Sequence, residues 1–431
     1  MRDDQMTFME ERDLTQLPET MRALVLSGAG FEHLSVRQVA VPRPGPRQLV
    51  ARVDAAGICT SLIKLVEQGP AHSQVYGWDL ARFPLILGDE GCITLVEIGE
   101  ELRGRYNSGE RYAIQPAVDH PPINHRERYR DNARGVNKVA VGYTLGGHLA
   151  EYILVPEEVL EAGCLLPLPA AGLPSAHAAM SEPISCCVSA QEHHLRLVQD
   201  SPGRERRAVK GLKRGGVTVI LGAGVMGRMH VDVAFGWGPH AIVVSDPLDA
   251  RLELVSHFFG ERARRAGTAL RVLNPRNASL KTAIDELTGG TGADDVIVAV
   301  GSRQAIEEAQ HLAGRGAVLN LFGGLKKGDD AVALDTGMVH YKEINVTGSS
   351  GGSPWDMART LELIASGQID AARHITRIGD LEHAPELLEM VKAQELDGKA
   401  VVYPHRRTSA IRAVRGWSAE DEREYLRRGK D

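Results

Sequence analysis

The sequence lacks several features by which common classes of protein are recognised. Aromatic residues make up only 5% of its 431 residues, which argues against a nucleic-acid surface built from stacked rings. The formal net charge is −6, so the chain is not a globally basic binder of nucleic acid. No apolar run approaches the roughly 20 residues of a membrane helix, and the charged first residues do not resemble a secretory signal. These absences predict a cytoplasmic protein that binds neither nucleic acid nor membranes.

Cysteine is sparse, whereas glycine is abundant. The five cysteines, at positions 59, 92, 164, 186 and 187, are odd in number and form no CxxC pair, so no disulfide framework is indicated. Glycine supplies 46 residues, which predicts many tight turns and close backbone approaches.

The pattern of predicted secondary structure changes near Val217. Before it, short β-type segments alternate with glycine and proline turns, with a helix expected over 178–198 and a surface insertion over 201–207. After it, strands and helices alternate, which predicts βαβ units and an α/β fold with a parallel sheet. The predicted parts are a polar arm over 1–20, a β-rich domain over 21–188, a dinucleotide-binding domain over 189–348, a return segment over 349–404 and a basic tail over 405–431. In the tail, Ser418 and Asp421 could cap a short helix.

A glycine-rich turn predicts the cofactor site. Gly222-Ala-Gly-Val-Met-Gly227 follows an apolar strand and opens a helix, and Asp246 ends the next strand 19 residues later, which completes the dinucleotide fingerprint. Gly224 would let the backbone approach the pyrophosphate, and Asp246 would accept hydrogen bonds from the ribose. The acidic group favours NAD, although Arg251 could accommodate the extra phosphate of NADP. The residues expected at the cofactor are Gly222, Gly224, Val225, Met226, Gly227, Asp246, Arg251 and Gly301.

Four motifs, in this order, resemble those of the zinc-dependent medium-chain dehydrogenases/reductases over roughly residues 21–404. They are Ala56-Gly-Ile-Cys-Thr-Ser, Pro84-Leu-Ile-Leu-Gly-Asp-Glu-Gly, Gly146-Gly-His-Leu-Ala-Glu-Tyr and Ser181-Glu-Pro-Ile-Ser-Cys. Within that family the chain resembles the alcohol and sorbitol dehydrogenases, and most closely the L-sorbose-1-phosphate reductase-like subgroup. The resemblance implies a GroES-like catalytic domain, a doubly wound Rossmann domain and a homo-oligomer. It also implies NAD(P)-dependent interconversion of a secondary alcohol and a ketone on a polyol, sugar or sugar phosphate.

The same resemblance implies a catalytic zinc held by Cys59, Asp89, Glu90 and Glu182, with Cys59, Ser61 and Glu90 as the catalytic residues. Two positions depart from the family pattern: Asp89 replaces a histidine, and Leu62 replaces the aspartate that would hold that histidine. The two changes are physically linked, because a carboxylate ligand has no ring N–H for a second carboxylate to hold.

Three interpretations of the site are open. Asp89 replaces histidine as a zinc ligand, the site takes a harder ion, or the metal is lost. With zinc, the ion and its three charged ligands sum to −1, which predicts a weaker Lewis acid. Ser61 is either the proton relay or a turn cap. No structural zinc is expected, because residues 115–142 contain no cysteine, and His120 and His148 receive no role.

The sequence also leaves two other functions open. One is a metal-free reductase of specialised metabolism, and the other is a catalytically silent NAD(P)-binding protein. In the oxidoreductase interpretation, the nicotinamide is expected near Val300, Gly301 and residues 321–323, in a cleft between the domains.

Overall fold

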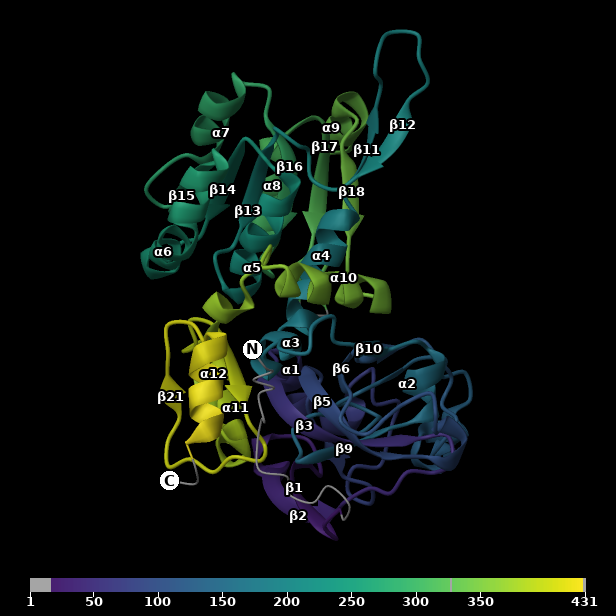
Figure 1. Cartoon of the computed structure of the whole chain (residues 1–431). Coiled ribbons are helices and arrows are strands. Elements are labelled where there is room, and N and C mark those ends of the chain that lie inside the picture. Colours follow the sequence, from purple (N-terminus) through teal and green to yellow (C-terminus); the bar gives the residue numbers. More distant parts are fainter. Residues whose placement is uncertain (1–16, 326–327, 429–431) are drawn as a thin grey trace. The chain divides into compact units, whose positions relative to one another are not determined.

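The computed structural model describes residues 17–325 and 328–428, and the chain forms two compact units (Figure 1). The first unit contains the described residues up to Met180 together with those from Ile375 onward, and the second spans Ser181–His374. The sequence analysis places the boundaries after residues 188 and 348. Residues 349–374 stay with the second unit because α10 (Pro354–Ala365) packs on α4 (Ser181–Glu192) there.

The first unit is built on mainly antiparallel sheets, with one parallel pair, β19 and β20. One sheet has the order β2-β1-β4, and a larger one has the order β10-β6-β5-β3-β20-β19-β21, with β9 also paired to β3. Its strands are β1 (Thr20–Leu26), β2 (Leu34–Ala40), β3 (Leu49–Ile58), β4 (Leu85–Ile86), β5 (Gly91–Ile98), β6 (Arg111–Ile114), β7 (Ala117–Val118), β8 (Val139–Ala140), β9 (Tyr152–Val155), β10 (Leu165–Pro167), β19 (Ile375–Gly379), β20 (Lys399–Val402) and β21 (Arg412–Ala413). Its α-helices are α1 (Ser61–Gln68), α2 (Glu157–Glu161), α3 (Ser175–Ala179), α11 (Ala384–Lys392) and α12 (Ala419–Arg427).

Strand β3 is the centre of this unit, and its sequence explains why. Nearly every residue of Leu49–Ile58 is buried, as expected for a strand covered on both faces. It pairs with β5, β9 and β20, so it joins the N-terminal strands to the C-terminal segment. The larger sheet therefore brings residues near 58, 90 and 400 together.

The segment after Pro404 is folded onto the first unit. Ser418 and Asp421 form the expected capping box of α12. Glu422 is buried and accepts hydrogen bonds from the backbone N–H groups of Ser175 and Ala176, both at 2.9 Å. The predicted basic tail thus contains a helix that stabilises the start of α3. The expected arm over 1–20 lies mostly outside the described residues, and Thr20 already begins β1.

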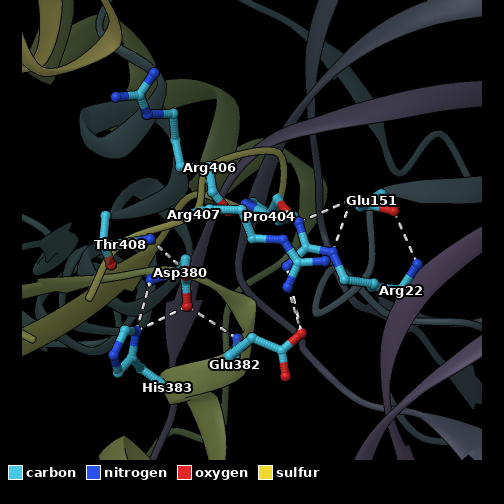
Figure 2. A network of polar contacts seen from close by, with 9 residues as sticks. All are labelled: Arg22, Glu151, Asp380, Glu382, His383, Pro404, Arg406, Arg407 and Thr408. Atoms are coloured by element: carbon cyan, nitrogen blue, oxygen red, sulfur yellow. Dashed lines mark hydrogen bonds and ion pairs between the residues drawn. The ribbon is translucent and has the colours of Figure 1, made fainter. Parts of the chain in front are cut away.

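Arg22 of β1 connects the N-terminal strand to the C-terminal segment (Figure 2). Its side chain is buried and donates to Glu151 Oε1 at 3.0 Å and to the carbonyl of Pro404 at 2.6 Å. It also forms an ion pair with Glu382 at 3.6 Å. Because three separate segments depend on one guanidinium, the network stabilises the packing of the chain ends within this unit.

We expect Arg22→Met to lower the free energy of unfolding by about 2–4 kcal/mol, because it removes the guanidinium donor of Glu151 Oε1 and leaves the buried Pro404 carbonyl without its donor. Arg37→Met, at an exposed position on the neighbouring strand β2, is the control and should change stability by less than about 0.5 kcal/mol. Urea unfolding of both variants measures the difference. Equal losses of stability would show that the Arg22 network contributes nothing specific.

The second unit is a parallel sheet with the strand order β15-β14-β13-β16-β17-β18. Its strands are β11 (Leu195–Val198), β12 (Arg207–Lys210), β13 (Val217–Leu221), β14 (Ala241–Ser245), β15 (Ala269–Leu273), β16 (Ala293–Val298), β17 (Ala313–Leu321) and β18 (Asn345–Gly348), and its helices are α4, α5 (Val225–Ala234), α6 (Asp249–Ala266), α7 (Leu280–Thr288), α8 (Arg303–Leu312), α9 (Thr336–Lys342) and α10. This order is the doubly wound arrangement that the alternating pattern predicts. Apolar clusters on both faces of the sheet bury the side chains of β13, β14 and β16.

One local prediction was wrong. The helix expected over 178–198 is divided into α3 and α4 and ends at Glu192, and its expected last residues form strand β11. The charged stretch over 201–207 is exposed, as expected, and lies in the connection of the antiparallel hairpin β11–β12, with Arg207 at the start of β12. Within the described part of the chain, no helix is both long enough and apolar enough to cross a bilayer.

Candidate active site

Cys59, Asp89 and Glu90 lie together in the first unit. One ligand atom from each lies within 4.8 Å of the other two. Cys59 directly follows β3, and Asp89 and Glu90 directly precede β5. The two strands pair antiparallel with Ala56 opposite Gly91, so the end of one strand meets the start of the other. The structure therefore brings together three of the four predicted metal ligands.

The cluster fits a metal ion because its oxygen atoms are buried without full hydrogen bonding. Asp89 is 5% exposed and Glu90 is 0% exposed. Among the described residues, Asp89 Oδ1 and Glu90 Oε2 are buried and have no hydrogen-bond partner of ordinary geometry. Buried carboxylate oxygens are costly unless they are paired or coordinate a metal. A thiolate with two carboxylates is also a donor set that zinc accepts.

The Ser61 hydroxyl is directed at Asp89. Its Oγ donates to Asp89 Oδ2 at 2.6 Å, and its backbone N–H lies 3.4 Å from Cys59 Sγ. Burial raises the pKa of Asp89, and the hydrogen bond from Ser61 opposes that rise. Leu62 is fully buried in the apolar core. The neighbour that orients Asp89 is therefore a hydroxyl group, and the position where the family has a carboxylate packs as an apolar residue.

Lys399 is a charged residue of this cluster that the sequence analysis missed. It begins β20, where Ala400 pairs with Ile58 of β3, and its ammonium forms a buried ion pair with Glu90 Oε1. Burial alone would lower the pKa of Lys399, but the charges of Glu90, Cys59 and Asp89 hold it well above the usual range. Burial raises the pKa of Glu90, and Lys399 opposes that rise.

Lys399 changes the expected charge of the site. The sequence analysis counts a zinc ion and three anionic ligands, which sum to −1. With the buried ammonium included, the formal charge of a zinc-loaded site is zero, so the charge count no longer predicts a weaker Lewis acid.

Close packing holds the two carboxylates in place. A Cβ at Gly57 would overlap Glu90 Oε2, and a Cβ at Gly91 would overlap the ring of His148. His148 is fully buried, and burial lowers its pKa to about 4. Its Nδ1 lies 3.2 Å from the carbonyl of Gly88, so it supports the backbone beside Asp89 as a neutral ring. His120 lies at the surface, 3.0 Å from Glu161.

Glu182, the fourth predicted ligand, begins α4 in the second unit. It is 9% exposed, and the Cys186 thiol lies 3.9 Å from its Oε1. Its assignment to the metal site stays a prediction.

The glycine-rich turn lies at the carboxyl end of β13, next to the loop after β16. In the strand order, the chain proceeds from β13 towards β15 on one side and from β16 towards β18 on the other. Doubly wound sheets bind ligands at the point where the order reverses in this way. A Cβ at Gly222 would lie 3.2 Å from the Val300 side chain, and one at Gly301 would lie 2.7 Å from the carbonyl oxygen of Gly324. The predicted residues Gly222 and Gly301 are thus brought to the same edge.

The glycines of the turn have different roles. Gly222 has a φ of +104°, a left-handed conformation that favours glycine. A Cβ at Gly227 would overlap the carbonyl of Gly222, whereas a Cβ at Gly224 would meet no atom within 4 Å. Gly224 is the N-cap of α5, and Val225 and Met226 form its first turn. The open space over Gly224 suits a phosphate at a helix N-terminus.

The buried carboxylate of Asp246 stabilises the glycine-rich turn. Its Oδ2 accepts the N–H of Ala223 at 2.9 Å, and its Oδ1 accepts the N–H of Leu248 at 3.0 Å. Each oxygen keeps a further lone pair for a ribose hydroxyl. Arg251 lies 3.6 Å from Asp246, so a cation and an anion lie together at the position that the sequence analysis predicts for the adenosine ribose.

Comparisons with known proteins agree with both halves of this arrangement. Residues 45–167 match the alcohol dehydrogenase GroES-like domain, and residues 225–366 match the zinc-binding dehydrogenase family. A mannitol-1-phosphate 5-dehydrogenase from Aliivibrio fischeri is 30% identical over 387 residues, which cover 87% of this chain and 85% of the relative. The chain belongs to the zinc-binding alcohol dehydrogenase family. It is therefore an oxidoreductase, as the motifs predict.

Two further proteins are similar to this zinc-binding dehydrogenase over most of its length. An L-sorbose 1-phosphate reductase from Klebsiella pneumoniae is 28% identical and covers 89% of this chain and 88% of its own. The crystal structure of a candidate zinc-binding dehydrogenase from Sinorhizobium meliloti 1021, bound to NADP, is 25% identical with a TM-score of 0.69, covering 90% of this chain and 100% of that chain. The predicted fold and the prediction of NAD(P) and zinc are confirmed at the level of the family.

Proposed function

We propose that this dehydrogenase interconverts a secondary alcohol and a ketone on a polyol, sugar or sugar phosphate. The buried cluster of Cys59, Asp89 and Glu90, with Ser61 hydrogen-bonded to it, carries the proposal. The two curated relatives named above act on a phosphorylated hexitol and a phosphorylated ketose, which supports the substrate class.

Each group has a defined part in the proposal. Zinc held by Cys59, Asp89 and Glu90 would supply a Lewis acid for the substrate oxygen. Oxidised NAD(P), with its pyrophosphate at the glycine-rich turn, would supply a nicotinamide ring as the hydride acceptor. Asp89 Oδ2 holds the proton of Ser61, so the lone pairs of the serine oxygen are available to a substrate hydroxyl. An outward proton relay through Ser61 would require this hydroxyl to rotate away from Asp89. Lys399, through its ion pair with Glu90, favours the ionised form of that carboxyl group against the effect of burial.

NAD is proposed as the preferred cofactor because the Asp246 carboxylate repels a 2′-phosphate. Arg251 is the residue on which a preference for NADP would depend. The five cysteines are free thiols, which suits a reducing compartment such as the cytoplasm.

The test is metal content together with cofactor-linked turnover of polyols and their phosphate esters. We expect close to one zinc ion per chain, and we expect Cys59→Ala to lose that zinc and at least about 10³-fold of kcat/KM, equivalent to roughly 4 kcal/mol. Cys164→Ala, at a buried thiol elsewhere in the same unit, should keep both. Wild-type protein that retains no zinc after incubation with the ion, or that oxidises no polyol or ester, would contradict the proposal.

A further inference from the structure

A basic pocket in the first unit is unaccounted for by the metal cluster or the cofactor site. It has a volume of about 330 Å³ and is lined by His72, Tyr76, Gly77, Arg130, Asp131 and Arg134, among others. This volume is in the range of small-molecule sites. Arg130 and Arg134 are exposed, and among the described residues neither forms an ion pair. The lining thus carries two guanidinium groups and one carboxylate, that of Asp131.

The backbone between these two arginines has an unusual conformation. Asp131, Asn132 and Ala133 occupy the left-handed region in succession, with φ values of 54°, 51° and 61°. Such conformations are costly for residues other than glycine and are found preferentially at binding sites. A Cβ at Gly77 would lie 2.7 Å from Arg130 Nε, so the absent side chain leaves room for this guanidinium.

Two sets of neighbouring residues link the lining of the pocket to the metal cluster. Along α1, Ser61 and Lys64 are three residues apart and share a face, and the charge of Lys64 acts with burial to lower the pKa of His72. Across the unit, the His72 ring lies 5.5 Å from the Tyr143 ring.

The residue before Tyr143, Gly142, packs against the backbone of Gly88 and Asp89. A Cβ at Gly142 would lie 2.6 Å from the Gly88 carbonyl carbon and 3.0 Å from the N atom of Asp89. Tyr143 therefore lies between His72, whose ring it contacts, and Gly142, which packs on the backbone of Asp89. The basic pocket is thus linked by packing contacts, from His72 through Tyr143 and Gly142, to the backbone of Asp89 within the same unit.

We propose that this pocket binds the phosphate group of a phosphorylated polyol or sugar whose alcohol carbon reaches the metal cluster. The inference rests on the function proposed above and narrows its substrate class to phosphate monoesters. Arginine is suited to the task because its planar guanidinium can donate two parallel hydrogen bonds to a phosphate. Arg130 and Arg134 supply these donors, and Lys64 adds a third positive charge on the side nearer to Ser61.

The test compares esters with their parent polyols in matched variants. D-mannitol 1-phosphate and D-mannitol are the oxidation pair, and L-sorbose 1-phosphate and L-sorbose are the reduction pair. In the Arg130→Gln/Arg134→Gln variant we expect kcat/KM for the esters to fall about 100-fold, mainly through KM, because two charge-assisted contacts are lost. The values for the unphosphorylated compounds should stay within about twofold, since those contacts are not used.

Control measurements separate this inference from the proposed function. Arg103→Gln, at an exposed arginine of the same unit, should leave both substrates unaffected. Inorganic phosphate should raise the melting temperature of the wild type and inhibit ester turnover competitively, and both effects should vanish in the double variant. D-gluconate is the carboxylate probe and should bind less tightly than phosphate.

The outcomes are distinct. Equal losses for esters and polyols, no loss for either, or phosphate binding that survives in the double variant would overturn the inference while polyol turnover still stands. Tighter binding of D-gluconate than of phosphate would replace the phosphate monoester by a sugar acid. If the wild type oxidises no polyol or ester, the proposed function fails, and the inference is then decided by phosphate binding alone: loss in the double variant sustains the pocket, and no loss overturns it.

Discussion

Replacing Lys399 by methionine is expected to lower the free energy of unfolding of the metal-free protein by about 3–5 kcal/mol. The substitution keeps an apolar chain of similar length but removes the only cation that the structure shows paired with Glu90 among the described residues. Glu90 is 0% exposed, so its carboxylate would be left buried and uncompensated. Urea unfolding in the presence of a chelator measures the loss.

A double-mutant cycle separates this charge effect from lost packing. Glu90→Gln alone leaves the Lys399 ammonium unpaired and should also destabilise the protein. Combined with Lys399→Met it should recover much of the stability, because neither charge is then buried. If the two single losses simply add in the double variant, the pair is not coupled and Lys399 acts only by filling space.

The sequence predicts those parts of the site that depend on short spacings. The glycine turn, the strand before it and the acidic residue after the next strand lie within about 30 residues, as in any βαβ unit. Local chemistry alone therefore places Gly222, Gly227 and Asp246, and the sheet order that surrounds them is confirmed. The meeting of Cys59, Asp89 and Glu90 was implied by the resemblance of their motifs to those of the family, and the pairing of β3 with β5 brings them together.

Lys399 could not be predicted in this way because it is 309 residues from Glu90 in the sequence. Only the pairing of β20 with β3 brings it to the cluster. A weak signal exists nevertheless. A lysine directly before the apolar run Ala400-Val-Val-Tyr403 is a cation at the start of a buried strand, and buried lysines are rare unless they are paired.

The hairpin β11–β12 was missed because its pattern is inverted. Leu195 and Leu197 are 54% and 63% exposed, whereas Arg196 between them is buried and paired with Asp295. A strand that points its leucines outward and its arginine inward does not show the usual alternation. Residues 195–198 therefore do not stand out from the preceding helix in the sequence, and the helix predicted over 178–198 wrongly includes them.

Gly224→Val is expected to weaken dinucleotide binding by at least about 100-fold, equivalent to roughly 2.8 kcal/mol, without destabilising the fold. Gly224 has a φ of −63°, which valine can adopt, and a Cβ there meets no protein atom within 4 Å. The valine side chain would instead fill the space over the N-terminus of α5, where the pyrophosphate is expected. Fluorescence titration with NADH and NADPH measures the affinity, and urea unfolding measures the stability.

Gly227→Ala provides the contrasting variant. Its Cβ would overlap the Gly222 carbonyl oxygen, so we expect a loss of roughly 1–3 kcal/mol of stability from the forced separation of helix and turn. The two glycines therefore predict opposite profiles: lost binding with intact stability at Gly224, and lost stability at Gly227. If Gly224→Val is folded and binds both dinucleotides as tightly as the wild type, the phosphates do not lie over this turn. The cofactor site would then have to be sought elsewhere along the carboxyl edge of the sheet.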